Sequence, residues 1–80
     1  MANAQATIDV RLFANLAAHM PPDASHYSIA HGMTVAALLQ RLKVPAAEAK
    51  LIFINGVKGH LHSRLQGGER VGIFPPVGGG

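Results

Sequence analysis

Cysteine is absent from this 80-residue sequence. Its absence excludes a disulfide framework, a zinc site built from thiolates and a cysteine nucleophile. Histidine, the other common metal ligand, occurs five times, but only His60 and His62 are spaced so that two imidazoles share one face of a strand. Few carboxylates accompany them, so we interpret the histidines as solvated side chains and predict no metal site.

Aromatic residues are also few, with three phenylalanines, one tyrosine and no tryptophan. Basic residues outnumber acidic ones by seven to four, and residues 41–80 carry six of the basic and two of the acidic side chains. Nucleic-acid binding by base stacking needs aromatic side chains among clustered cations, whereas here the cations stand singly. We therefore expect a solvated basic face and no nucleic-acid partner.

Long apolar runs are missing as well. The first segment, MANAQATIDV, has neither the basic start nor the apolar stretch of a signal peptide, and no segment is long enough to span a bilayer. We expect a cytoplasmic protein without a membrane partner. Hydrophobic residues nevertheless make up 49% of the chain and charged ones 14%, which indicates one small domain folded around a core.

Several apolar segments have the features of β-strands. In TIDVRLFA, residues 7–14, apolar and polar side chains alternate, and Phe13 is an apolar exception on the outer side. LIFING, residues 51–56, is rich in β-forming residues and ends in a turn at Asn55-Gly56. The predicted strands, in chain order, are residues 7–14, 26–30, 51–54, 59–62 and 70–74. We expect their inner face to carry Ile8, Val10, Leu12, Leu51, Phe53, Val71 and Ile73.

One segment, MTVAALLQRLKVP, has the period of an amphipathic helix. Its apolar residues are Val35, Leu38, Leu39 and Leu42, at positions i, i+3, i+4 and i+7. Thr34 is a good N-cap, and Pro45 prevents the helix from continuing. With only one helix available, its apolar stripe must cover one face of a single sheet. The sequence therefore predicts an α+β fold in which one amphipathic helix packs on a mixed four- to five-stranded sheet.

This order of elements, together with LFANLAA, FING and the ending GGERVGIFPPVGGG, resembles the ubiquitin-like β-grasp family. Within that family it is most similar to the sulfur carriers of molybdopterin and thiamine synthesis, and above all to the small subunit of molybdopterin synthase. The specific part is the ending from Phe74 to Gly80, in which two prolines and a valine precede the glycines. The resemblance implies a β-grasp domain over residues 1–74 and a flexible reactive tail over residues 75–80.

The resemblance also implies a chemistry for the tail. A carboxylate with a pKa of about 3.5 is ionised at neutral pH and is a poor electrophile, so it must be activated. In such carriers an ATP-dependent activating enzyme, an adenylyltransferase, forms an acyl-adenylate on the last glycine, here Gly80. A persulfide donor enzyme then supplies the sulfur of a thiocarboxylate. Gly79 and Gly80 lack a Cβ and suit threading through a narrow tunnel, and Pro75 and Pro76 stiffen the start of the tail.

The chain is thus expected to be a co-substrate rather than an enzyme on its own, with no bound cofactor, since ATP is used by the activating enzyme. Its thiocarboxylate would deliver sulfur to a pterin precursor of the molybdenum or tungsten cofactor while the chain is docked on the large catalytic subunit of molybdopterin synthase. By strand parity, we expect a partner-binding patch on the open sheet face. The predicted partner-binding residues are Phe13, Ile52, Ile54, Phe74, Pro75, Pro76 and Val77.

The sequence leaves three alternatives open. The first is a ubiquitin-like modifier, conjugated to lysines through an isopeptide bond from Gly80. The second is a sulfur carrier for thiamine or another thio-metabolite pathway, because those carriers share the terminal glycines without the two prolines. The third is a small interaction domain with an inert tail.

Overall fold

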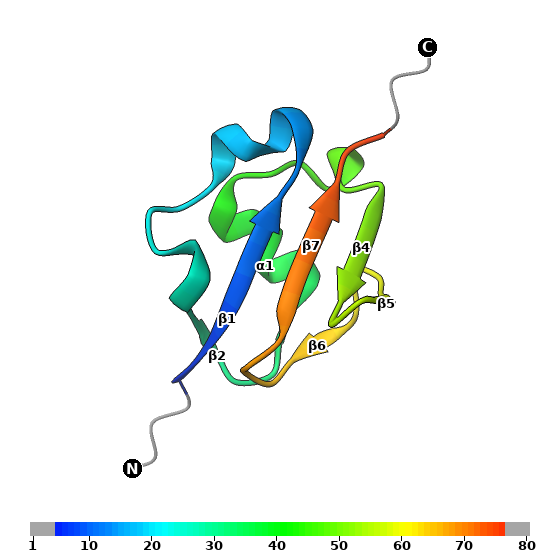
Figure 1. The fold of residues 1–80 in the computed structure, drawn as a ribbon. Coiled ribbons are helices and arrows are strands. Elements are labelled where there is room, and N and C mark those ends of the chain that lie inside the picture. Colours follow the sequence, from blue (N-terminus) through cyan, green and yellow to red (C-terminus); the bar gives the residue numbers. More distant parts are fainter. Residues whose placement is uncertain (1–4, 77–80) are drawn as a thin grey trace.

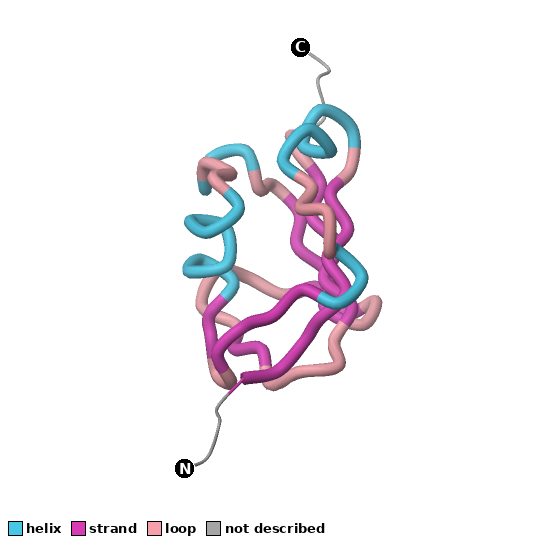
Figure 2. Tube along the Cα trace, turned by 90° about the vertical axis from the view of Figure 1, so that its left-hand side faces the viewer, coloured by secondary structure: helices cyan, strands magenta, loops and turns pink. Residues whose placement is uncertain are grey.

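A five-stranded sheet with one α-helix on one face forms the body of the protein (Figure 1). The structure is a computed structural model, and it describes residues 5–76 of the chain. The long strands are β1 (Gln5–Leu12), β2 (Tyr27–Ala30), β4 (Leu51–Ile54) and β7 (Arg70–Phe74), and the edge strand β5 is Val57–Lys58. The helix α1 is Val35–Leu42. Seen from the side, helix and sheet form two layers (Figure 2).

The strand order in the sheet is β2-β1-β7-β4-β5. The central strands β1 and β7 pair in parallel, and the other neighbours pair antiparallel. Two shorter strands, β3 (Met33–Thr34) and β6 (Arg64–Leu65), form a second small sheet beside the helix start. The predicted α+β class, one helix on a mixed sheet with the β-grasp order, is confirmed.

Helix α1 begins directly after Thr34, as the sequence predicted, and ends before Pro45. The Thr34 hydroxyl accepts a hydrogen bond from the Ala37 backbone N–H at 3.2 Å, which satisfies one of the free donors of the first turn. Lys43 ends the helix in the left-handed conformation, with φ of 62°. The predicted stripe is buried in full: Val35, Leu38, Leu39 and Leu42.

The connection between β1 and β2 is folded rather than irregular. It contains two short 3₁₀-helices, η1 (Ala14–His19) and η2 (Ala24–His26), and a third, η3 (Ala46–Glu48), follows α1. Leu16 of η1 is buried and extends the core under this connection. The Met20 sulfur accepts the backbone N–H of Leu12 at 3.4 Å, so the connection also holds the end of β1.

The inner face of β4 differs from the prediction. Ile52 is buried opposite Ile73, and Ile54 lies opposite Val71 and packs against the core. Ile52 and Ile54 therefore face the helix, and the prediction that they belong to the open-face patch was wrong. Leu51 and Phe53, predicted on the inner face, have the opposite parity. All four residues of Leu51–Ile54 are apolar, so no alternation in the segment itself fixes its phase.

The short strand predicted at residues 59–62 was also placed wrongly. Asn55 and Gly56 both have positive φ, 54° and 82°, as in the tight two-residue hairpin turns that match strand twist. The partner strand β5 must therefore start at Val57, directly after the turn. Residues 60–63 form a turn instead, closed by a hydrogen bond from the Ser63 backbone N–H to the His60 carbonyl.

Two glycines form the turn before β7. Gly67 has φ of 119°, and a Cβ there would lie 2.7 Å from the Ala6 Cβ, so only glycine fits. The Glu69 carboxylate accepts hydrogen bonds from the backbone N–H groups of Gln66 and Gly67, which fixes the turn.

Within residues 5–76, no helix is long and apolar enough to cross a membrane.

Replacing Leu39 by alanine is expected to lower the free energy of unfolding by about 2–5 kcal/mol, because a fully buried leucine leaves a cavity under the sheet. Gln40→Ala is the matched control on the exposed side of the same turn, with a change within about 0.5 kcal/mol. Denaturant unfolding followed by circular dichroism measures both. Equal stabilities for the two variants would mean that the helix buries its other side.

Candidate functional site

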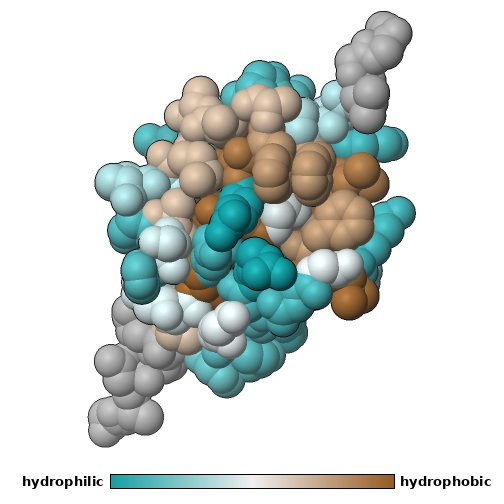
Figure 3. Space-filling model, in the orientation of Figure 1, coloured by the Kyte–Doolittle hydropathy of each residue, from teal (hydrophilic) through white to brown (hydrophobic). Residues whose placement is uncertain are grey.

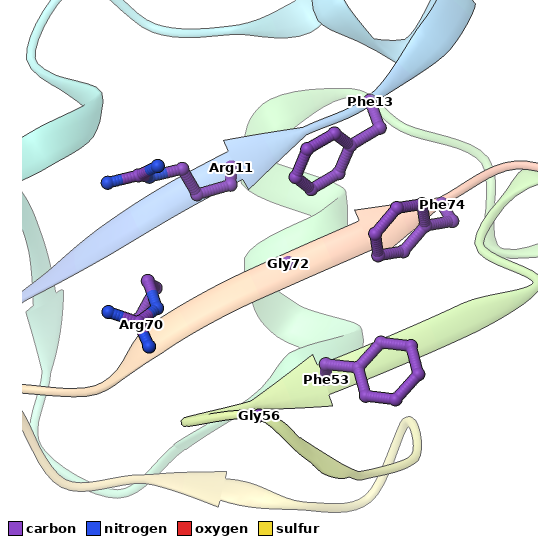
Figure 4. A pocket seen from close by; sticks show the side chains of 7 residues that line it. All are labelled: Arg11, Phe13, Phe53, Gly56, Arg70, Gly72 and Phe74. Carbon is purple, nitrogen blue, oxygen red and sulfur yellow. The ribbon is translucent and has the colours of Figure 1, made fainter.

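The open face of the sheet carries a cluster of three phenylalanines, which we call the aromatic patch. Phe13 and Phe74 stack with their ring centroids 4.2 Å apart and their planes 1° from parallel. Phe53 meets Phe74 edge to face, with centroids 5.8 Å apart. The rings come from three adjacent segments, the end of β1, β7 and β4 (Figure 4). In the view onto this face, hydrophobic surface gathers over part of the sheet and hydrophilic surface adjoins it (Figure 3).

Strand register explains why these rings meet. Gly72 in β7 lies between Arg11 of β1 and Phe53 of β4, so this row of side chains points to the open face. Two residues further along β7, Phe74 lies opposite Leu51. The Phe13 backbone N–H donates to the Ile73 carbonyl at 3.1 Å. The open face thus presents the outward side chains of all three strands.

A shallow hollow of about 230 Å³ lies beside the aromatic patch, above Gly72. Its lining is mixed: aromatic rings stand toward one end, and two guanidinium groups toward the other (Figure 4). Six of the residues that line it are Arg11, Phe13, Phe53, Arg70, Gly72 and Phe74. Because Gly72 has no side chain, the floor of the hollow is backbone.

The two arginines differ in their partners. Arg11 donates to both carboxylate oxygens of Asp9, at 3.2 and 3.0 Å. This hydrogen bonding lowers the pKa of Asp9 below its ordinary value of 3.8 and raises the pKa of Arg11. The guanidinium of Arg70 has no carboxylate within ion-pair distance among residues 5–76. Asp9 stands across from Arg70 in register and its pKa is also lowered by the Arg70 charge, but no direct ion pair neutralises Arg70 among the described residues.

The predicted partner-binding residues separate into three groups. Phe13 and Phe74 lie together in the aromatic patch, whereas Ile52 and Ile54 belong to the core. Pro75 is half-buried and Pro76 is exposed, directly after the last residue of β7. Val77, Gly79 and Gly80 lie outside the described residues. His60 and His62 lie near one another, with ring centroids 6.4 Å apart, and no group of three or more metal-ligating side chains occurs in the described part of the chain.

Sequence reasoning missed three residues of this surface: Phe53, Gly72 and Arg11. One signal for Phe53 was present, because an aromatic residue commonly stands across from a strand glycine and covers it. With Gly72 placed on the open face by the alternation of Val71 and Ile73, its neighbour on the third strand should be aromatic. Arg11 had no such signal, since any exposed strand position accepts a basic side chain.

Comparison with known proteins places this arrangement in a class. Among solved structures, the chain is similar to the HVO 2177 protein of Haloferax volcanii, with a TM-score of 0.77 and 21% identity over 100% of this chain and 92% of that one. It is also similar to SAMP1 from Haloferax volcanii, with a TM-score of 0.63 and 24% identity over 92% of this chain and 99% of that one. At these identities the two structures establish the fold. Comparison with curated protein sequences gives no significant match.

The parallel pairing of first and last strands under one helix, shared with these structures, defines a small ubiquitin-like β-grasp protein. The model of the ThiS family matches residues 10–80, and the chain belongs to this family of ubiquitin-like sulfur carriers. Carriers of this type work with activating enzymes and sulfur-transfer partners, and they are typically not enzymes themselves.

The two faces of β7 should respond oppositely to the same substitution. Phe74→Asp is expected to leave the domain folded, because Phe74 lies on the open face and loses mainly ring contacts worth about 0.5–1.5 kcal/mol. Ile73→Asp should unfold it, because Ile73 is fully buried and an unpaired carboxylate cannot be accommodated there. Circular dichroism and amide NMR spectra of both variants test this. Unfolding of Phe74→Asp, or a folded Ile73→Asp, would reverse the assignment of faces.

The Asp9–Arg11 pair predicts a pH dependence. Because the pKa of folded Asp9 lies below its unfolded value, the stabilisation is present at neutral pH and is lost as the pH falls through the folded pKa. The effect on stability is small, since the pair is solvent-exposed. An NMR titration of the Asp9 carboxyl should give a value below 3.8 that moves back toward 3.8 in Arg11→Gln. An unchanged value in that variant would exclude the hydrogen bond as the cause.

Proposed function

We propose that this protein is the sulfur carrier of molybdopterin synthesis, acting as the small subunit of a molybdopterin synthase. The observation that carries the proposal is the position of Phe74. This residue is at once the centre of the aromatic patch and the last residue of β7, directly before the sequence Pro75-Pro76-Val77 and the terminal glycines. A docking surface and a reactive tail therefore share one residue.

The proposed reacting group is the carboxyl of Gly80. An ATP-dependent adenylyltransferase would convert it to an acyl-adenylate, with pyrophosphate as the leaving group. The terminal sulfur of an enzyme persulfide would then attack the acyl carbon and displace AMP, which gives an acyl disulfide. A second thiol, supplied by a partner because this chain has no cysteine, would reduce that bond, so that a disulfide forms on the partner side and a thiocarboxylate is left on Gly80. The chain itself needs no bound cofactor for these steps, because ATP and persulfide are held by the partner enzymes. Glycine at positions 79 and 80 suits a narrow active site, since a backbone without Cβ fits where a side chain would clash.

The aromatic patch suits the docking step. Phe13, Phe53 and Phe74 offer an apolar centre, and Arg11, Arg70 and Lys58 provide charge around it. Apolar centres with polar rims are typical of protein interfaces, and aromatic side chains often dominate their affinity. The proposed partners at this surface are the activating enzyme and the large catalytic subunit, which would use the same face in turn. In this proposal the carrier alternates between the two partners, and its tail either carries the sulfur or lacks it.

Activation should depend on a free carboxyl at Gly80. We expect incubation with ATP, the adenylyltransferase and a persulfide donor to raise the intact mass by the difference between sulfur and oxygen. A variant extended beyond Gly80, shown by mass not to be trimmed, is expected to remain unchanged while keeping the same circular dichroism spectrum. Thiocarboxylate formation on the extended chain would contradict the proposal.

The same measurement tests the pathway and the chief alternative. Addition of the large synthase subunit and a sulfur-free pterin precursor should return the thiocarboxylate to a carboxylate. Retention of sulfur under those conditions, but loss of it to a thiazole-forming enzyme, would assign the carrier to thiamine synthesis. Appearance of a mass equal to the carrier joined to a second protein through lysine would assign the modifier function instead.

A further inference from the structure

Gly72 occupies a position where the fold itself does not require glycine. Its φ is not in the positive range, and a Cβ there would lie 3.4 Å from Phe13 Cε2 and 3.8 Å from Phe74 Cε1, which is ordinary contact. Elsewhere the fold does need glycine: Gly67 has φ of 119°, and a Cβ there would lie 2.7 Å from the Ala6 Cβ. Glycine in a strand interior weakens the strand and often marks a place where another molecule approaches closely. The rings of Phe13 and Phe74 border the position that this Cβ would take, and the hollow beside them is open to a group from outside.

The walls of this space define what would fit. The rings of Phe13, Phe74 and Phe53 provide apolar contact, and the floor is the backbone of β7. The opposite end carries two arginines. Arg11 is ion-paired with Asp9, whereas Arg70 stands across from Asp9 in register but makes no direct ion pair among the described residues. A group that is apolar over most of its surface and negatively charged at one side can contact the aromatic rings at one end and the arginines at the other.

We propose that the hollow receives one protruding apolar side chain from a partner protein, and that a carboxylate beside that side chain pairs with Arg70. The proposal rests on the proposed function only in taking the adenylyltransferase as that partner. Charge complementarity favours an acidic surface, because Lys58 stands across from Phe53 on the same face and adds to the positive charge. A second copy docked by this face would instead bring the same cations together.

The chemistry of the hollow can be tested on this chain alone. The probes are 3-phenylpropionate and its neutral amide, titrated against the isotope-labelled protein and followed by amide NMR. We expect the backbone N–H signals of Gly72 and Arg70 to shift when a probe is added. The shifts should be larger with 3-phenylpropionate than with its neutral amide. Gly72→Val should abolish the shifts by filling the space. Arg70→Gln should remove the difference between the probes, and Arg41→Gln, on the helix, should not.

Several outcomes would overturn the proposal. Equal shifts with both probes, no shift with either probe, or shifts that survive in Gly72→Val would show that the hollow does not recognise an apolar group beside a carboxylate. Shifts of the Gly72 amide on raising the protein concentration would assign the hollow to a second copy, and shifts on deleting residues 77–80 would assign it to the chain's own tail. If Gly72→Val does not fold, Gly72→Ala, whose methyl group reaches the Phe13 ring, is the variant to measure.

The partner itself is tested by binding of the purified adenylyltransferase. Gly72→Val and Arg70→Glu are each expected to weaken binding by about tenfold or more, and the Arg70 effect should shrink at high salt. Arg41→Glu is the matched charge reversal and should bind as the native chain does. Native affinity for both hollow variants would overturn the proposal. Absence of thiocarboxylate on the native chain would instead refute the proposed function, while the NMR titration would still decide what the hollow recognises.

Discussion

The parallel pairing of β1 with β7 is the constraint on which the rest of the molecule depends. Its register sets Val10 beside Val71 and Leu12 beside Ile73, and these four residues form the centre of the core. The same register turns Arg11 and Gly72 to the open face. Hydrogen bonds from Asp9 to Glu69 and from Phe13 to Ile73 extend the ladder at both ends. The core and the candidate site therefore lie on opposite faces of the sheet, and both depend on one strand pairing between segments about 60 residues apart in the chain.

Local signals were sufficient for the elements that are determined locally. The helix could be predicted because Thr34, the apolar stripe and Pro45 each carry their own physical reason, independent of the rest of the chain. Strand β1 could be predicted because apolar and polar residues alternate within it. The phase of β4 could not, because its four apolar residues suit either face equally. Its phase is set by its pairing with β7 and by the Asn55-Gly56 turn, which are tertiary and turn-geometry constraints.

The candidate site was predictable only in part for the same reason. Phe13 and Phe74 could be placed on the open face from the alternation within their own strands. Their stacking, and the hollow beside them, depend on the relative register of three strands. Gly72 lines the hollow only because Arg11 of β1 and Phe53 of β4 are its neighbours in the sheet, and no local sequence pattern connects these residues with it. Recognition surfaces on sheets are generally of this kind, since cross-strand neighbours are distant in sequence.

The position of Phe74 also limits where a partner's chemistry can take place. Its carbonyl accepts the Lys50 N–H at 2.9 Å, so the sheet ladder holds this residue up to the start of the two prolines. From there six residues lead to Gly80, and an extended chain covers at most about 3.5 Å per residue. In the proposed function, a reactive centre engaging Gly80 must lie within about 20 Å of the aromatic patch. Docking at the patch then confines the carboxyl to a small volume, and the fixed φ of Pro75 and Pro76 reduces the conformations that remain to be lost. The proposed docking face can thus contribute to the rate of tail activation as well as to affinity.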